Sequence, residues 1–145
     1  MWVEFLRGVY GTIEFHQPSS VFELDEAEAK LGLKLPDELR SVLRETNGVT
    51  GEYGLGLLWP IQRIVEDNMK FREHGDFRHL YMPFDHLLFF ADAGNGDQFA
   101  YSIRADGAIH HPDIFAWNHE NDSRAWVAPS LKHYFEWWAN GSIKL

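Results

Sequence analysis

The densest group of side chains able to do chemistry lies in the segment from Trp117 to Arg124. It contains an imidazole, carboxylates and a guanidinium, which suit metal binding or proton transfer. A catalytic zinc ion needs three convergent protein ligands and an open position, whereas adjacent residues on regular backbone point apart. His119 with either Glu120 or Asp122 therefore gives too few ligands on its own.

A structural interpretation of the same segment needs no ligand. Asn118 and Asp122 are residue types that satisfy backbone groups in loops, and Arg124 can pair with an acid. The segment can also act as a loop that presents Glu120 and Asp122 to a protein partner. The sequence favours the structural interpretation, with partner binding second and metal binding third.

A small metal-dependent hydrolase is a further alternative. It requires the fold to bring metal ligands together from two separate segments. The residues concerned are His110, His111, Asp113, His119 and Glu120. Divalent metal bound at near-unit stoichiometry would be its signature.

A glycine-rich segment, Gly94-Asn95-Gly96-Asp97, lies between Asp92 and Gln98. It lacks the Lys and Ser/Thr of a phosphate-binding P-loop and the acid spacing of a calcium loop. The pattern predicts a bulged β-hairpin turn with its glycines at positive φ. The functional alternative is a tip that offers Asp92, Asn95 and Asp97 to a partner.

Nucleophilic catalysis finds no support in the sequence. There is no cysteine, which excludes disulfides, thiolate zinc ligands and thiol nucleophiles. No serine stands in a G-x-S-x-G motif. Asp85 and His86 are neighbours, and neighbours rarely pair as a base with its orienting acid. We therefore expect no catalytic residue, no cofactor and no metal.

Composition narrows the class of partner. The chain has 145 residues and a formal net charge of −9, which predicts one domain over 1–145 and argues against binding a nucleic-acid backbone. A basic protein partner is favoured instead. No apolar run reaches the ~20 residues of a membrane helix, and the start lacks the pattern of a signal peptide, so we expect a cytoplasmic protein without a membrane contact.

Aromatic residues make up 15% of the chain, more than a core of this size needs. Some are therefore expected at the surface, where exposed tryptophans are enriched at binding hot spots. Trp59 and Trp137 are the candidates for such contacts, although a last helix buried on two sides is the favoured explanation of Trp137.

Helical periodicity and end signals mark five segments. Asp25 and Glu28 fit a capping box that opens the second helix, and Gly32 stops it. Pro36 suits the first position of the third, whose apolar stripe begins at Leu39. The expected helices span 2–9, 25–31, a segment from Pro36 to Asn47-Gly48, a segment opened by Pro60, and one from Pro129-Ser130 to Asn140-Gly141.

Strand patterns concentrate between residues 87 and 117. The expected strands are 57–59, 87–91, 99–104, 108–110 and 114–117, with Asp106-Gly107 as a hairpin turn. Helices first, an antiparallel meander of about four to six strands next and a closing helix packed on the sheet define an α+β fold.

A family resemblance is carried chiefly by residues 24–68. The motif residues are Glu28, Leu31-Gly32, Leu35-Pro36, Leu39, Leu43, Asn47-Gly48, Trp59, Ile64 and Asp67-Asn68. This pattern resembles the SUKH superfamily, in its Smi/Knr-type branch. A pattern of a bacterial subgroup follows in Phe84-Asp85-x-Leu87-Leu88-Phe89-Phe90, in residues 94–97, and in residues 117–124.

The resemblance implies an α+β fold and a protein that binds another protein. Bacterial members are regarded mostly as immunity proteins, which bind a toxin, often a nuclease, whereas fungal relatives act in cell-wall regulation. Because the motif residues pack or set backbone angles, they support the fold more than the partner.

We therefore expect a bacterial, non-catalytic immunity protein, a monomer or weak homodimer, that neutralises a cognate toxin with a basic surface. A regulatory or scaffolding protein with an endogenous partner is the first alternative, and the hydrolase is the second. The expected contact residues are Asp92, Asn95, Asp97, Glu120, Asp122, Trp59 and Trp137.

Overall fold

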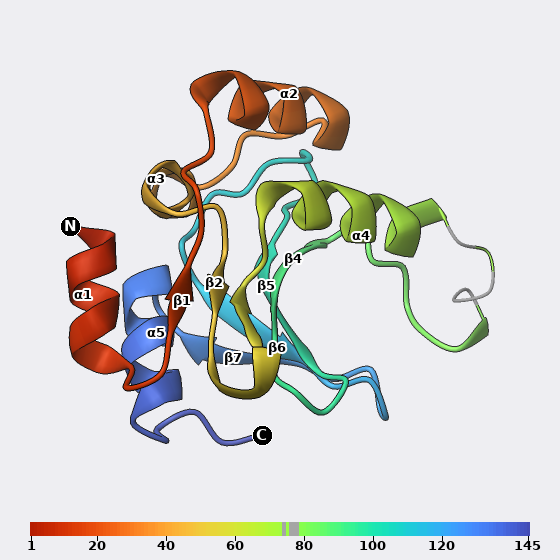
Figure 1. The fold of residues 1–145 in the computed structure, drawn as a ribbon. Helices are drawn as coiled ribbons and strands as arrows, with labels where there is room; N and C mark the ends of the chain where they lie inside the picture. Colours follow the sequence, from red (N-terminus) through yellow and green to blue (C-terminus); the bar gives the residue numbers. More distant parts are fainter. Residues whose placement is uncertain (74, 76–78) are drawn as a thin grey trace.

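A computed structural model describes residues 1–73, 75 and 79–145 and shows an α+β fold, which confirms the predicted class. Figure 1 shows the helices arranged around two antiparallel sheets, with the last helix beside the first. The helices are α1 (Trp2–Val9), α2 (Val21–Leu31), α3 (Asp37–Glu45), α4 (Ile61–Glu73) and α5 (Leu131–Ala139).

The sheets differ in size. The smaller has the strand order β1 (Glu14–Phe15), β2 (Val49–Thr50), β3 (Gly56–Leu58), and the larger is a meander of β4 (Leu87–Asp92), β5 (Gln98–Ser102), β6 (Ile114–Trp117) and β7 (Arg124–Ala128). They meet just after β3, where the Trp59 N–H donates to the Phe90 carbonyl at 2.8 Å. This contact ties the N-terminal half of the chain to the meander.

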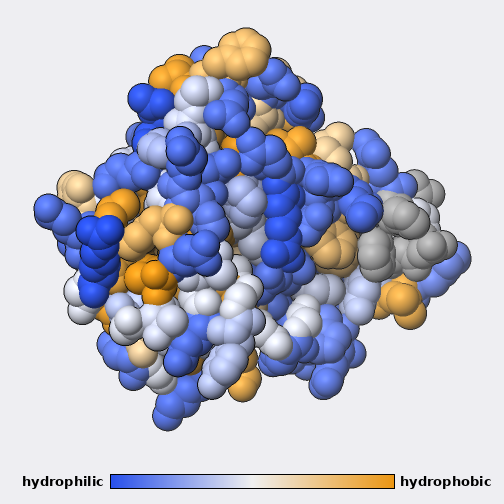
Figure 2. Space-filling view, viewed as in Figure 1, coloured by the Kyte–Doolittle hydropathy of each residue, from blue (hydrophilic) through white to orange (hydrophobic). Residues whose placement is uncertain are grey.

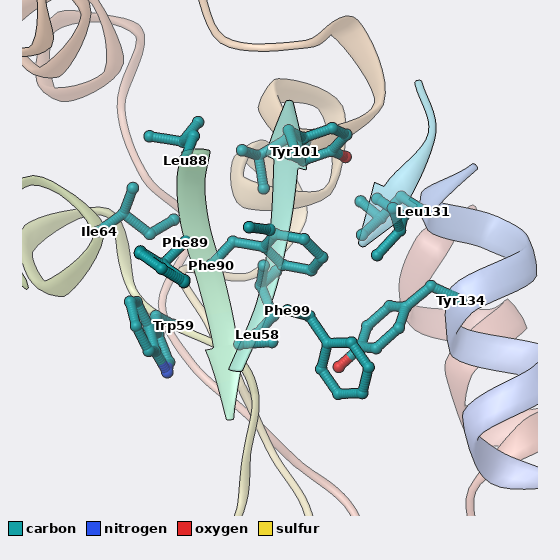
Figure 3. Close-up of a cluster of buried hydrophobic side chains, with 14 of the residues drawn as sticks. Leu58, Trp59, Ile64, Leu88, Phe89, Phe90, Phe99, Tyr101, Leu131 and Tyr134 are labelled. Atoms are coloured by element: carbon teal, nitrogen blue, oxygen red, sulfur yellow. The ribbon is translucent and has the colours of Figure 1, made fainter. Parts of the chain in front are cut away.

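Strands β4 and β5 of the meander are buried on both faces, so their aromatic residues pack in two directions. Figure 3 shows Phe89 with Ile64 of α4 on one side of β4, and Phe90 with Tyr134 of α5 on the other. Phe90 and Tyr134 meet edge to face, with ring centroids 5.4 Å apart. The prediction of a C-terminal helix packed on the sheet is therefore confirmed.

Helix α4 is fastened to β4 by the side chain of Asn68, which is 1% exposed. Its Nδ2 donates to the carbonyls of Ile64 at 2.7 Å and Phe89 at 2.8 Å. Its Oδ1 accepts the Phe89 N–H at 2.8 Å. One asparagine thus satisfies backbone groups at the edge of the sheet, where β4 is the last strand among the described residues.

The start of α2 corrects the predicted capping box. Ser20 is the N-cap: its Oγ accepts the Glu23 N–H at 3.1 Å, and Glu23 Oε1 accepts the Ser20 N–H at 3.0 Å. The helix therefore begins earlier than residue 25. Glu28 serves the next connection instead, where its Oε2 accepts the Leu35 N–H at 2.7 Å. The predicted end at Gly32 is confirmed, with φ +72°.

Two further expectations were wrong in detail. Residues 108–110 are not a strand, although the expected turn forms, with the Arg104 N–H donating to the Ala108 carbonyl at 2.8 Å. Helix α3 ends at Glu45, with Thr46 extended, so Gly48 does not cap it. Gly48, at φ +99°, instead turns the chain into β2, and a Cβ there would lie 2.9 Å from the Pro60 nitrogen.

Candidate functional site

Three connections gather at one end of the molecule, at the bottom of Figure 1. They are the β2–β3 connection (51–55), the β4–β5 turn (93–97) and the β6–β7 loop (118–123), which we call the loop end. The β4–β5 turn is the centre of this group. A Cβ on Gly94 would lie 3.4 Å from Leu55 Cδ1 on one side, and a Cβ on Gly96 would lie 2.9 Å from the His119 ring on the other.

The β4–β5 turn holds its glycines at positive φ, as the pattern predicted, whereas the bulge of this hairpin lies inside β4, where the register shifts between Phe89 and Ala91. Gly94 and Gly96 have φ values of +95° and +97°, and the Ala93 N–H donates to the Asp97 carbonyl at 3.0 Å. Asn95 supports the turn from within, because its Oδ1 accepts the Asp97 N–H at 3.0 Å. The Asn95 residue itself remains exposed at the tip.

Asp97 joins the turn to the β6–β7 loop. Its Oδ1 lies 2.7 Å from His119 Nδ1 and accepts the His119 N–H at 3.1 Å. The residue is only 5% exposed. Asp97 is therefore a positioning residue of the loop end, and little of it is available for direct contact with a partner.

Asp122 organises the β6–β7 loop from a left-handed conformation at φ +60°. One oxygen accepts the Met82 N–H at 2.8 Å, and the other accepts the Trp117 indole N–H at 2.8 Å and an Arg124 N–H at 3.1 Å. Burial opposes ionisation, but these hydrogen bonds outweigh it and hold the pKa of Asp122 below its ordinary value.

Asn118 completes this loop by accepting the Glu120 N–H at 2.8 Å. The structural interpretation of the segment, with Asn118 and Asp122 serving backbone groups and Arg124 paired with an acid, is therefore confirmed. Glu120 projects from the supported loop and is exposed. Its side chain makes no hydrogen bond with any described residue.

Asp92 and Trp59 lie beside the loop end and are joined by Arg63. The Arg63 guanidinium donates to both Asp92 oxygens, at 2.9 and 3.1 Å, and lies 4.1 Å above the centre of the Trp59 ring. Trp59 is 0% exposed. A side chain without exposed surface cannot contact a partner in this conformation. We therefore do not count Trp59 among the residues that could touch a partner directly.

Trp137 lies on α5, away from these loops. It is half-buried and meets Trp126 edge to face, with centroids 6.3 Å apart, and His133 at 5.3 Å. The structure therefore does not bring Trp137 together with the other candidate residues.

Tyr53 is an exposed aromatic residue at the loop end that sequence reasoning missed. It is 101% exposed relative to a reference tyrosine and has φ +58°, a left-handed conformation that is costly for an aromatic residue. Glu52 beside it is also exposed. The only signal was the Gly51-Glu-Tyr-Gly54 run between two short strands, which is typical of a tight connection.

Three of the five residues of the hydrolase alternative are engaged with separate partners. His110 Nε2 lies 2.6 Å from Asp106 Oδ2, Asp113 accepts the Trp126 indole N–H at 3.0 Å, and His119 pairs with Asp97. Across residues 1–73, 75 and 79–145, no three His, Asp or Glu side chains are placed to hold a metal ion.

Comparison with protein families decides the relationship of the chain. The model described as SMI1-KNR4 cell-wall, of the SUKH type, matches residues 22–135. The chain belongs to the SMI1-KNR4 (SUKH) family. The matched part runs from α2 into α5 and includes the loop end. No curated protein matches the chain in sequence.

The SUKH motif residues have the structural roles expected of them. Leu31, Leu35, Leu39 and Leu43 are buried, Gly32 ends α2 at positive φ, and Asn68 binds α4 to β4.

Among the described helices, none has the length and apolar character needed to cross a membrane.

Proposed function

We propose that this SUKH protein is a non-catalytic binding module, an immunity protein that neutralises a toxin with a basic surface in the bacterial cytoplasm. The observation that carries the proposal is the loop end, where hydrogen bonds of Asp97 and Asp122 hold the β4–β5 turn and the β6–β7 loop. Tyr53, Glu52 and Glu120 are exposed there. Family membership supports a protein-binding role. The net charge of −9 favours a basic partner.

The loop end suits binding because its shape is set before a partner arrives. Asp97 and Asp122 spend their hydrogen-bonding capacity on the loops, so little ordering remains to be done on association. Tyr53 offers a large amphipathic surface of the kind enriched at hot spots. Within the proposed site, Tyr53 and Glu120 contact the toxin, Asn95 lies between them, and Asp92, Asp97 and Asp122 position the loops.

Charge and shape act at different stages of binding. A net negative protein attracts a basic toxin over a screening length of about 8 Å at physiological salt, which raises the association rate. Aromatic contact then slows release. Neutralisation follows from covering the toxin's working surface, without a chemical step by this chain.

The proposal is tested with the product of the reading frame beside this gene, by co-expression and by titration of the purified pair. Tyr53→Ala should weaken binding by about 2 kcal/mol, roughly thirtyfold, through faster release. Glu120→Gln should slow association severalfold and reduce its salt dependence. Glu4→Gln removes an exposed acid on α1 and serves as the matched control.

Protection of the cell that depends on Tyr53 would support the proposal. Cells that die equally with and without this protein would contradict the pairing with that toxin. Binding that Tyr53→Ala and Glu120→Gln leave unchanged, while the toxin is still neutralised, would place the contact surface elsewhere.

A further inference from the structure

A second surface lies at the top of Figure 1, between α2 and α4 and away from the loop end. It is a groove of about 700 Å³, open to solvent. Ala27 and Ile61 close its floor, and Val65 and Met69 are half-buried in its wall. In Figure 2, apolar surface shows between these two helices with hydrophilic surface on either side.

The groove is held open by contacts at its edges. Gln62 of α4 donates to Glu23 Oε2 of α2 at 2.8 Å and so joins the two helices near their N-termini. Asn68 fixes the opposite side of α4 to β4. Because α4 is tied on one side to the sheet and at one end to α2, the helices cannot easily close over the apolar floor.

The rim of the groove is acidic. Four glutamates line it against two lysines: Glu23, Glu26, Glu66 and Glu73, with Lys30 and Lys70. Lys30 is already paired with Glu26 at 3.1 Å. Glu66 and Glu73 are exposed and have no ion pair with any described residue. An apolar floor between negative edges is complementary to a helix with one apolar face and basic flanks.

We propose that the α2–α4 groove binds a basic amphipathic helix of a partner protein. The α4 wall from Ile61 to Glu73 spans about 18 Å at 1.5 Å per residue, which matches apolar anchors at positions i, i+3 or i+4, i+7 and i+11. Met69 adapts its shape to different anchors, as methionine does on promiscuous binding surfaces. This inference is independent of the proposed function and holds for a toxin or for any other partner with such a helix.

The test uses a synthetic peptide of about 18 residues, with leucine on one helical face and lysine or arginine on the other. It is titrated into the full chain labelled with ¹⁵N, and backbone shifts are followed by NMR. The shifts should concentrate at the groove lining, including Ala27, Val65 and Met69. A scrambled peptide of the same composition, without an apolar face, should bind at least about tenfold more weakly.

Matched charge reversals separate the groove from general attraction. Glu66→Lys with Glu73→Lys should weaken peptide binding about tenfold. Glu4→Lys with Glu14→Lys changes the net charge by the same amount at exposed positions on α1 and β1, outside both surfaces, and should change binding less than about twofold. These values follow from short-range charge pairing across a screened surface.

Four results would overturn the proposal. The first is a set of backbone NMR shifts that is spread over the whole surface or centred on the loop end. The second is equal binding of the scrambled peptide, and the third is an equal loss of peptide affinity in the two charge-reversed variants. The fourth is a set of groove shifts that depends on protein concentration without peptide, which would assign the groove to a second copy of this chain. Because the toxin assay reads Tyr53 and the peptide assay reads Glu66 and Glu73, failure of one does not imply failure of the other.

Discussion

Replacing Asn68 by alanine should destabilise the protein more than any change to an exposed asparagine. The substitution removes three buried hydrogen bonds and leaves the Phe89 N–H and carbonyl without partners on the β4 edge. Each net hydrogen bond contributes about 1 kcal/mol, and each stranded backbone group adds desolvation of a similar size. The expected loss is therefore about 3 to 5 kcal/mol of the free energy of unfolding.

The assay is urea unfolding at 25 °C, followed by circular dichroism and tryptophan fluorescence. For a domain with about 5 to 15 kcal/mol in total, the midpoint should fall sharply while the slope is retained. Asn121→Ala is the control, since the exposed Asn121 makes a single local bond to the Ser123 N–H at 2.9 Å and should cost about 1 kcal/mol or less. An Asn68→Ala loss no greater than this control would refute the reasoning.

Three other predictions concern the loop end. Gly96→Ala should cost about 1 to 3 kcal/mol, because its φ is +97° and the new Cβ would meet the His119 ring, whereas Gly8→Ala, inside α1 with nothing within 4 Å, should stabilise by about 0.5 to 1 kcal/mol in the same urea assay. Tyr53→Gly should relieve about 1 kcal/mol of left-handed strain and yet remove a contact with the toxin. The melting temperature should therefore rise while the affinity for the toxin falls. Asp122→Asn should flatten the acid side of the stability profile: the folded pKa of Asp122 is depressed, so its ionisation contributes stability above the unfolded pKa of about 3.9, and that stability is lost as pH falls through the folded pKa. If the free energy of unfolding falls equally steeply in both proteins between about pH 5 and pH 2, this expectation for Asp122 is contradicted.

Sequence patterns predicted the elements that have long periodic stretches. The stripe of Leu39, Val42 and Leu43 and the end of α2 at Gly32 were read correctly, because each depends on neighbours within a few residues. In the expected strand 99–104, large apolar residues alternate with small or polar ones, which is typical of a strand with one exposed face, yet Ala100 is as buried as Phe99. Alternation in burial fails there because both faces of the sheet are covered at β4 and β5.

Other parts of the fold carried no readable signal. Strands β1 and β2 contain two residues each, too few for any period to show. The capping box was assigned to Asp25 and Glu28 although Ser20 and Glu23 have the same spacing. Both pairs fit the motif. What distinguishes them in the structure is that Glu28 accepts the Leu35 N–H, a contact outside the helix that the motif does not reveal.

The candidate site was predicted in composition and missed in geometry. Sequence could nominate Asp92 and Asp97 as acids in a turn, but their partners Arg63 and His119 lie 29 and 22 residues away. Contacts over such separations decide which acids support the loops and which remain free. Tyr53 was missed because nothing local distinguishes an exposed tyrosine from a core one.

The loop end divides its work between two sets of side chains. Asp97, His119 and Asp122 hold the framework through hydrogen bonds, whereas Tyr53 and Glu120 make no side-chain hydrogen bond with any described residue. Substitutions at the second set should therefore leave folding nearly intact. Related proteins can therefore change the partner that they bind through substitutions at a few exposed loop positions, while the fold stays the same.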